Sequence, residues 1–86
     1  MNSTKKNLTE VGKFLRKLRF EHDESQEDMA KRLGIATPYI SLLEGKQGVT
    51  KKLAVKIINV YNLTGKDKEL FINLVSQDII NRFWGK

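Results

Sequence analysis

Side chains that can bind anions gather in the middle of the chain. Gln26 begins a predicted helix, where free backbone N–H groups and the positive end of the helix dipole attract an anion. Lys46 and Gln47 fall in a predicted loop, and Lys51 and Lys52 fall in the first turn of the next helix. Lysine in a first turn opposes the helix dipole, so a bound phosphate explains it better than helix stability does. We therefore expect these five residues to contact phosphates; the alternative for each lysine is an ordinary solvated side chain.

Residue types that support catalysis or hold metal ions are scarce. The chain has no cysteine, which excludes disulfides, thiolate catalysis and thiolate metal sites. Its single histidine, His22, cannot form a metal site alone. The acidic cluster of Glu24, Glu27 and Asp28 is better explained as favourable charge at a helix N-terminus than as a set of metal ligands. Because the sequence offers no nucleophile–base pair and no phosphate-binding glycine loop, we expect no enzyme, no cofactor and no metal.

The chain is strongly basic. Its 86 residues carry a formal net charge of +6, from 16 lysines and arginines against 10 acidic residues, and this length is that of one domain. Most of the positive excess lies before residue 57, which is typical of a protein whose partner carries phosphates; the alternative is a solvated surface. No apolar run approaches the ~20 residues that span a membrane, and the N-terminus lacks the apolar region of a signal peptide. We expect a cytoplasmic location without membrane contact.

The spacing of apolar residues predicts an all-α domain of five short helices without strands. The first helix is expected from about Thr9 to His22. Ser25 is a good N-cap for the second helix, and Asp28 three residues later approximates a capping box. Gly34 supplies the left-handed exit from that helix. The apolar face of the first helix is expected to consist of Val11, Phe14, Leu15 and Leu18.

The remaining helices have similar start signals. Thr37 followed by Pro38 reads as an N-cap with proline at the first helical position, and this third helix should run to about Glu44. Thr50 caps the fourth helix, and Thr64 marks the start of the fifth. The inward residues are expected to be Ile40 and Leu43 in the third helix, Leu53, Ala54, Ile57, Ile58 and Tyr61 in the fourth, and Leu70, Phe71, Leu74 and Val75 in the fifth.

A helix, a tight turn through glycine and a second helix make up the helix-turn-helix, a DNA-reading device. The stretch from Gln26 to Glu44, QEDMAKRLGIATPYISLLE, has this form, with a small residue at Ala30 where the two helices cross. Ser-Gln-Glu at residues 25–27 opens it and Ile-Ser-Leu-Leu-Glu at residues 40–44 closes it. With these motifs the chain resembles the lambda-repressor/Cro-like (XRE-type) family of helix-turn-helix domains, over roughly Val11 to Val75.

The sequence departs from the family pattern at three positions. Asp23 and Glu24 stand where a glycine and an apolar residue are usual. The apolar core contact that the family pattern has at position 24 is therefore not supplied by Glu24. Ala36 stands where many members have a serine or threonine cap, so Thr37 is expected to cap instead.

The resemblance also implies a structural ion pair between Arg19 and Glu44 that joins the first helix to the recognition helix.

The resemblance implies that Thr37, Pro38, Ser41 and Leu42 face base edges in the major groove and that Tyr39 lies toward the sugar-phosphate backbone. This helix lacks arginine, asparagine and glutamine, so the bidentate readers of guanine and adenine are missing. Specificity would then depend on methyl contacts, DNA shape and water. The alternatives are a surface or dimer contact for Leu42 and a core aromatic with a rim hydroxyl for Tyr39.

We expect a flexible N-terminal arm at residues 1–8, the helix-turn-helix domain at residues 9–75 with its motif at 26–44, and a C-terminal helical extension at residues 76–86. The extension carries one apolar stripe, formed by Ile79, Ile80, Phe83 and Trp84. Two arrangements would cover it: folding back on Val11 and Phe14, or meeting a second chain about a two-fold axis, which we favour.

The sequence thus predicts a lambda-repressor-like protein that binds specific double-stranded DNA as a homodimer on an inverted repeat. Its role would be that of a transcriptional regulator, most simply a repressor, at a bacterial or phage-host nucleoid. Two alternatives stay open: the DNA-binding antitoxin of a toxin–antitoxin pair, with a toxin as partner, and a protein-interaction module that has lost DNA binding. An interaction module would not need basic residues around the motif.

Overall fold

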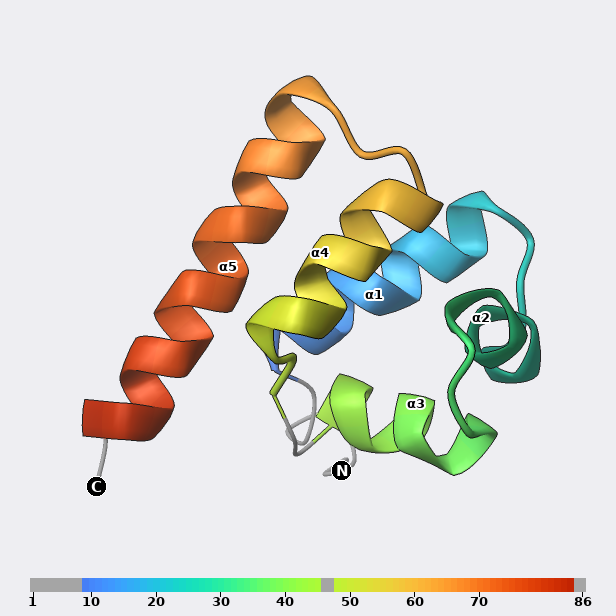
Figure 1. Ribbon diagram of the computed structural model, residues 1–86, viewed down its shortest axis with the longest axis horizontal. Helices are drawn as coiled ribbons and strands as arrows, with labels where there is room; N and C mark the ends of the chain where they lie inside the picture. Colours follow the sequence, from blue (N-terminus) through green and yellow to red (C-terminus); the bar gives the residue numbers. More distant parts are fainter. Residues whose placement is uncertain (1–8, 46–47, 85–86) are drawn as a thin grey trace, which may run out of the picture.

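The computed structural model describes residues 9–45 and 48–84, which form five helices and, within those ranges, no strand (Figure 1). The helices are α1 (Glu10–Glu21), α2 (Gln26–Leu33), α3 (Thr37–Gly45), α4 (Lys51–Val60) and α5 (Gly65–Trp84). The expected all-α class is therefore confirmed. The arm expected at residues 1–8 lies outside the described residues.

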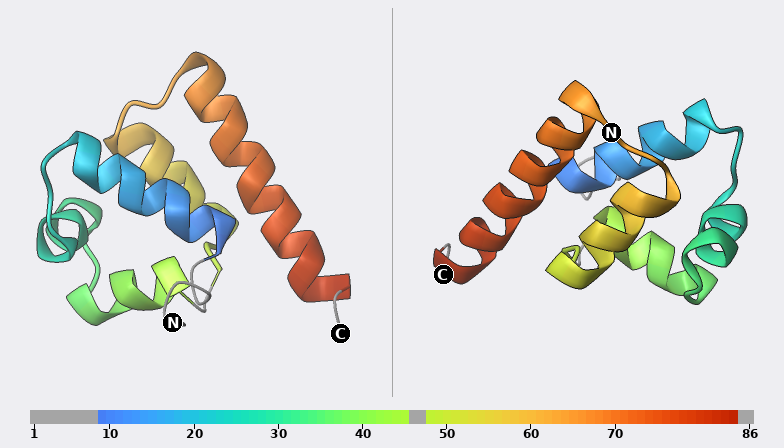
Figure 2. Two further views of the ribbon diagram at one scale, coloured as in Figure 1. Left: turned by 180° about the vertical axis from the view of Figure 1, so that it is seen from behind. Right: turned by 45° about the horizontal axis from the view of Figure 1, so that its top comes forward.

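Helix α1 is central to the packing. Its N-cap is Thr9, whose hydroxyl accepts a hydrogen bond from the Gly12 N–H at 2.9 Å. The predicted apolar face turns inward, with Val11, Leu15 and Leu18 buried and Phe14 half-buried. α1 packs against both α3 and α5, and Figure 2 shows it crossing between them.

Helices α2 and α3 follow each other through a short turn. α2 begins with the predicted capping box, in which Ser25 and Asp28 exchange backbone and side-chain hydrogen bonds. It ends at Gly34 with φ of 70°, a left-handed conformation that a side chain would disfavour. α3 begins at Thr37, so the prediction that Thr37 is the cap before the helix was wrong by one residue. Pro38 does not fix the residue at which α3 begins. Proline has no N–H, and it is tolerated throughout the first turn because N–H groups there have no i−4 partner within the helix.

Helix α4 has the predicted N-cap, Thr50, whose hydroxyl accepts a hydrogen bond from the Leu53 N–H at 3.2 Å. Helix α5 differs from the expectation of short helices, because it continues unbroken for 20 residues to Trp84. Phe71 and Val75 are buried as expected, but Leu70 is exposed. α1 and α4 cover only one side of α5, and a step of 100° along the helix turns Leu70 away from that side.

A single apolar cluster joins the helices. The ring of Phe14 on α1 stacks on Phe71 of α5, with ring centroids 5.1 Å apart. Fully buried side chains from every helix complete the cluster, among them Leu15, Met29, Leu33, Ile40, Leu43, Ile57 and Phe71. Among the described helices, none is both long enough and apolar enough to cross a membrane.

Candidate nucleic-acid interface

The inner side of α3 fixes its rotation about the helix axis. Ile40 and Leu43 are fully buried, and the Glu44 side chain is also buried at the end of the helix. Because positions three and four residues apart share one helix face, the residues between them must point outward. The rotation that the core imposes therefore decides which residues α3 presents to a partner.

A buried ion pair joins the end of α3 to α1. The Arg19 Nε donates a hydrogen bond to the Glu44 Oε2 at 2.8 Å, and Nη2 donates to Oε1 at 3.3 Å. The two side chains are only 8% and 4% exposed, so the pair lies beneath the α2–α3 unit as predicted for a structural contact. Arg19 Nη1 also donates to the backbone carbonyl of Glu24 at 3.1 Å, which ties the α1–α2 turn to the same guanidinium.

Gln26 belongs to this buried network as well as to the start of α2. Its side-chain Nε2 donates a hydrogen bond to the Glu44 Oε1 at 3.2 Å. The side chain is therefore engaged with the protein, and sequence reasoning did not find this contact. An anion at this end of α2 would meet the backbone N–H groups of the first turn, which is the contact that the dipole argument requires.

The backbones of α1 and α3 approach each other most closely at Gly12. A Cβ added at this position would overlap the backbone carbonyl of Glu44, so only glycine fits without movement of the helices. Gly12 and Arg19 lie two turns apart on one face of α1, and both contact Glu44. The position of the α3 C-terminus is thus set by backbone contact as well as by charge.

The outer face of α3 contains the residues predicted to face bases. Thr37, Pro38, Ser41 and Leu42 are all exposed, and Leu42 has 44% of its surface accessible to solvent. Tyr39 differs from them because it is half-buried and packs against the core. The structure thus brings four of the five predicted α3 residues onto one open surface, and the fifth lies at its edge.

Of the predicted phosphate contacts, Lys52 lies beside this surface, in a pocket with Tyr39, whereas Lys51 lines a groove between α4 and α5. Lys51 and Lys52 are exposed in the first turn of α4. A surface pocket between the α2–α3 unit and α4 is lined by Leu33, Ile35, Tyr39, Thr50, Lys52, Leu53 and Lys56. Lys46 and Gln47, the other two predicted contacts, lie outside the described residues.

Lys56 is a cation of this surface that sequence reasoning missed. It lines the same pocket as Tyr39 and Lys52, and its Nζ reaches the turn at Gly34, 3.4 Å from where a Cβ would stand there. The spacing from Lys52 to Lys56 is one helical turn, so the helix periodicity contained a signal for it.

The acidic cluster has two separate structural roles. Asp28 caps α2, and its hydrogen bonds with the Ser25 backbone and hydroxyl lower the pKa of its carboxyl. The sequence predicts that Glu24 acts as favourable charge at a helix N-terminus, but the structure gives it other partners. Its carboxylate pairs with Arg32, which donates from Nε at 2.6 Å, and accepts a hydrogen bond from the Tyr61 hydroxyl.

Tyr61 therefore links the end of α4 to the α1–α2 turn. Burial raises the pKa of its hydroxyl, and the hydrogen bond to Glu24 raises it further. The Arg32 guanidinium lies over the ring at 4.9 Å from its centroid, and the His22 ring meets it edge-on at 5.1 Å. In the described part of the chain, no group of three or more histidine and acidic side chains is placed to hold a metal ion.

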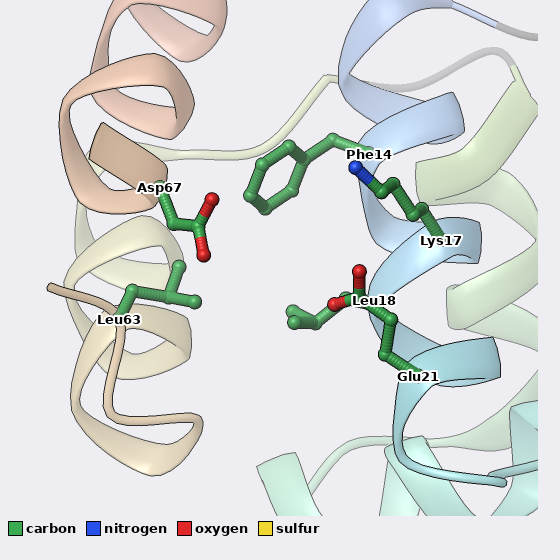
Figure 3. A pocket seen from close by; sticks show the side chains of 6 residues that line it. All are labelled: Phe14, Lys17, Leu18, Glu21, Leu63 and Asp67. Atoms are coloured by element: carbon green, nitrogen blue, oxygen red, sulfur yellow. The ribbon is translucent and has the colours of Figure 1, made fainter. Parts of the chain in front are cut away.

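Figure 3 shows a small pocket between α1, the α4–α5 connection and α5. By helix periodicity, its α1 residues lie on the opposite side of that helix from Gly12 and Arg19. Four lining residues come from α1, one from the α4–α5 connection and one from α5; they are Phe14, Lys17, Leu18, Glu21, Leu63 and Asp67. The pocket is thus separated from the exposed face of α3 by the width of α1.

Two of the three C-terminal stripe residues whose side chains the structure describes are exposed in the single chain. Ile79 packs partly against the core, whereas Ile80 and Phe83 are exposed. Of the two residues that the fold-back alternative names, Phe14 stacks on Phe71, upstream of the stripe, and Val11 lines a pocket with Gln77, Asp78 and Asn81 of the extension. The choice between fold-back and a second chain stays a prediction. The side chain of Trp84, the fourth residue of the stripe, lies outside the described part of the structure.

The chain matches no protein-family model, no curated protein and no solved structure.

Proposed function

We propose that the chain is a lambda-repressor-like transcriptional regulator that binds specific double-stranded DNA, with α3 as the recognition helix of a helix-turn-helix. The observation that carries this proposal is the exposed face of α3, which has lysines of α4 near its edge and is fixed by buried contacts on its opposite side. Thr37, Ser41 and Leu42 form an open surface, while a buried ion pair and two fully buried side chains hold the other face. A helix presented in this way suits the major groove.

The lysines of α4 support the same proposal. Lys51, Lys52 and Lys56 are exposed on α4, and the last two line a pocket with Tyr39 beside the α2–α3 unit, whereas Lys51 lines the groove between α4 and α5. Cations at the edge of a groove-reading helix neutralise DNA phosphates and release counterions, which supplies affinity independent of sequence. Repression would follow where such a site overlaps a promoter.

We also propose that two copies bind together through α5. Two half-sites on one face of DNA lie ~34 Å apart, one helical turn. The protein measures 32 × 30 × 22 Å, so two copies placed side by side have centres about one helical turn apart. α5 forms one flank of the protein while α3 lies along another side, so a contact through α5 leaves α3 open (Figure 1).

A protein partner is the second candidate, and one surface favours it. A groove between α4 and α5 is lined mostly by apolar residues, of which Val55 and Ile72 are exposed, together with Lys51 and Ser76. A DNA-binding antitoxin would use both this groove and α3, whereas a protein-interaction module would use the groove alone. Duplex binding therefore separates the module from the other two.

The test is salt-dependent binding to labelled duplexes of roughly 30 base pairs, long enough for two half-sites. With about 6 phosphate contacts per dimer, affinity should fall about a thousandfold or more between 50 and 200 mM salt. Lys51→Gln and Lys52→Gln should each weaken binding to all sequences and flatten the salt dependence.

Matched controls are Lys66→Gln and Lys68→Gln, in the first turn of α5 at the far end of the molecule from α3 (Figure 1). These substitutions remove the same charge and should leave affinity nearly unchanged. If no duplex binds tighter than about 0.1 mM at low salt, the DNA-binding proposal fails, because non-specific binding is ordinarily stronger than that.

A further inference from the structure

Two rows of side chains run along the exposed face of α3. Thr37 and Ser41 are four residues apart and form a row of hydroxyl groups. Pro38 and Leu42 have the same spacing and form an adjacent apolar row. All four residues are exposed, and the burial of Ile40 and Leu43 prevents the helix from turning a different face outward.

The chemistry of the two rows limits what they can recognise. A hydroxyl donates to or accepts from either type of base, so the first row discriminates weakly. The apolar row can make no hydrogen bond, and the one apolar feature that a base presents in the major groove is the methyl group on C5 of a pyrimidine. Because α3 reads TPYISLLEG, it offers no arginine, lysine, asparagine or glutamine for bidentate recognition of a purine.

The spacing of the apolar row also fits methyl groups on a duplex. Positions four residues apart on a helix are displaced along its axis by about 6 Å. Successive bases of one strand are displaced by about 3.4 Å. Pro38 and Leu42 can therefore each meet a C5-methyl group when two pyrimidines lie about two base steps apart.

We propose that the apolar row, Pro38 and Leu42, makes this protein a reader of pyrimidine C5-methyl groups in the major groove. The ligand is duplex DNA with thymine at these positions or, by the same chemistry, 5-methylcytosine. The proposal rests on the DNA binding proposed above and adds what distinguishes one duplex from another. Methylation of a cytosine at a contacted position then creates a binding site from a sequence that lacks thymine there.

The experiment begins with selection of bound duplexes from a pool randomised over about 20 base pairs, the length of two half-sites. Each thymine of the selected duplex is then replaced by uracil, which removes only the methyl group. Burying one methyl group corresponds to about fourfold in affinity, so uracil at a contacted position should weaken binding about fourfold in each half-site. Cytosine paired with guanine at that position should bind weakly, and 5-methylcytosine should recover the lost factor.

The variant Leu42→Ala tests the assignment to this residue. It should bind thymine and uracil equally at one position of each half-site while keeping the salt dependence of the parent protein. Lys51→Gln is the matched control, because it should weaken both duplexes by the same factor and preserve the fourfold difference. Circular dichroism of both variants should match the parent protein, since both residues are exposed.

The outcomes are distinguishable. Tight, selective binding with no difference between thymine and uracil overturns methyl reading and leaves the DNA-binding function intact. A thymine preference that survives Leu42→Ala and Pro38→Ala assigns the discrimination elsewhere and overturns the proposal. If the pool yields no preferred sequence, sequence-specific binding fails, and methyl reading fails with it.

Discussion

Glu44→Gln should destabilise the protein strongly, although it keeps the size and shape of the side chain. The substitution removes one charge from an ion pair whose two side chains are only 8% and 4% exposed. The Arg19 guanidinium would keep its hydrogen bond to the Glu24 carbonyl but would lose its counter-charge in a largely buried site. Breaking a buried pair from one side costs about 3–5 kcal/mol.

A loss of this size is a large part of the total free energy of unfolding. A domain of this length has an unfolding free energy of roughly 4–13 kcal/mol. A loss of about 3 kcal/mol lowers the thermal midpoint by more than about 10 °C in a domain of this size. Urea denaturation followed by circular dichroism, with the thermal melt as a second measurement, would give both quantities.

The exposed pair of Lys13 and Glu10 supplies the control. Its Nζ–Oε2 distance is 3.3 Å, but the two side chains are 57% and 73% exposed. Lys13→Met should therefore change the unfolding free energy by no more than about 0.5 kcal/mol. The comparison isolates burial, since both variants remove one charge of an ion pair.

A double-mutant cycle completes the test. Arg19→Met combined with Glu44→Gln removes both buried charges, so its cost should be well below the sum of the single costs. A strongly stabilising buried pair is ruled out if Glu44→Gln costs no more than Lys13→Met. It is also ruled out if the two single costs add, because independent effects would mean that neither charge depends on the other.

Three further outcomes follow from single positions. Gly12→Ala should lower the unfolding free energy by about 1–3 kcal/mol although alanine is the better helix former, because its Cβ would overlap the Glu44 backbone; stabilisation in urea denaturation would contradict the close approach of α1 and α3. Ile80→Lys should convert a dimer to a monomer in analytical sedimentation without loss of helix signal, and an unchanged mass would place the dimer contact elsewhere. In Tyr39→Phe, phenolate absorbance from Tyr61 should develop above pH 10.0, because burial and a neighbouring carboxylate raise its pKa. This raised folded-state pKa adds stability that is fully present below pH 10.0, the ordinary tyrosine pKa, and is lost as the pH rises from there through the folded-state pKa. Half-complete ionisation of Tyr61 at pH 10.0 would show that its contact with Glu24 is not made.

Helix boundaries were predictable because capping is a local exchange of hydrogen bonds. Ser25 with Asp28, and Thr50, cap the helices that their sequence positions indicate, and Gly34 ends α2 in the left-handed conformation. Each of these signals acts within three or four residues, so one stretch of sequence contains the whole interaction. Proline at position 38 was a weaker signal, since it is accommodated at several first-turn positions.

Contacts between distant residues were harder to foresee. The inward face of α1 follows from periodicity, but periodicity does not reveal that Glu24 finds its partners in Arg32 and Tyr61. The side-chain bond from Gln26 to Glu44 was missed for the same reason, because it depends on how two helices cross. Periodicity also predicted an inward Leu70, since it marks apolar residues and not the extent of the surface that covers them.

The stack of Phe14 on Phe71 bears on the order in which the helices assemble during synthesis. α2 and α3 are neighbours in the chain and pack on each other, so their contact closes only a short loop. α1 finds its partners in α3 and α5, and the stack with α5 joins segments near opposite ends of the described chain. The entropic cost of the longer closure is only on the order of 1 kcal/mol greater, but contacts of short sequence separation form first. Of the five helices, α1 is the first to be synthesised, and its apolar face is fully covered only when residue 71 has been added and α5 has docked.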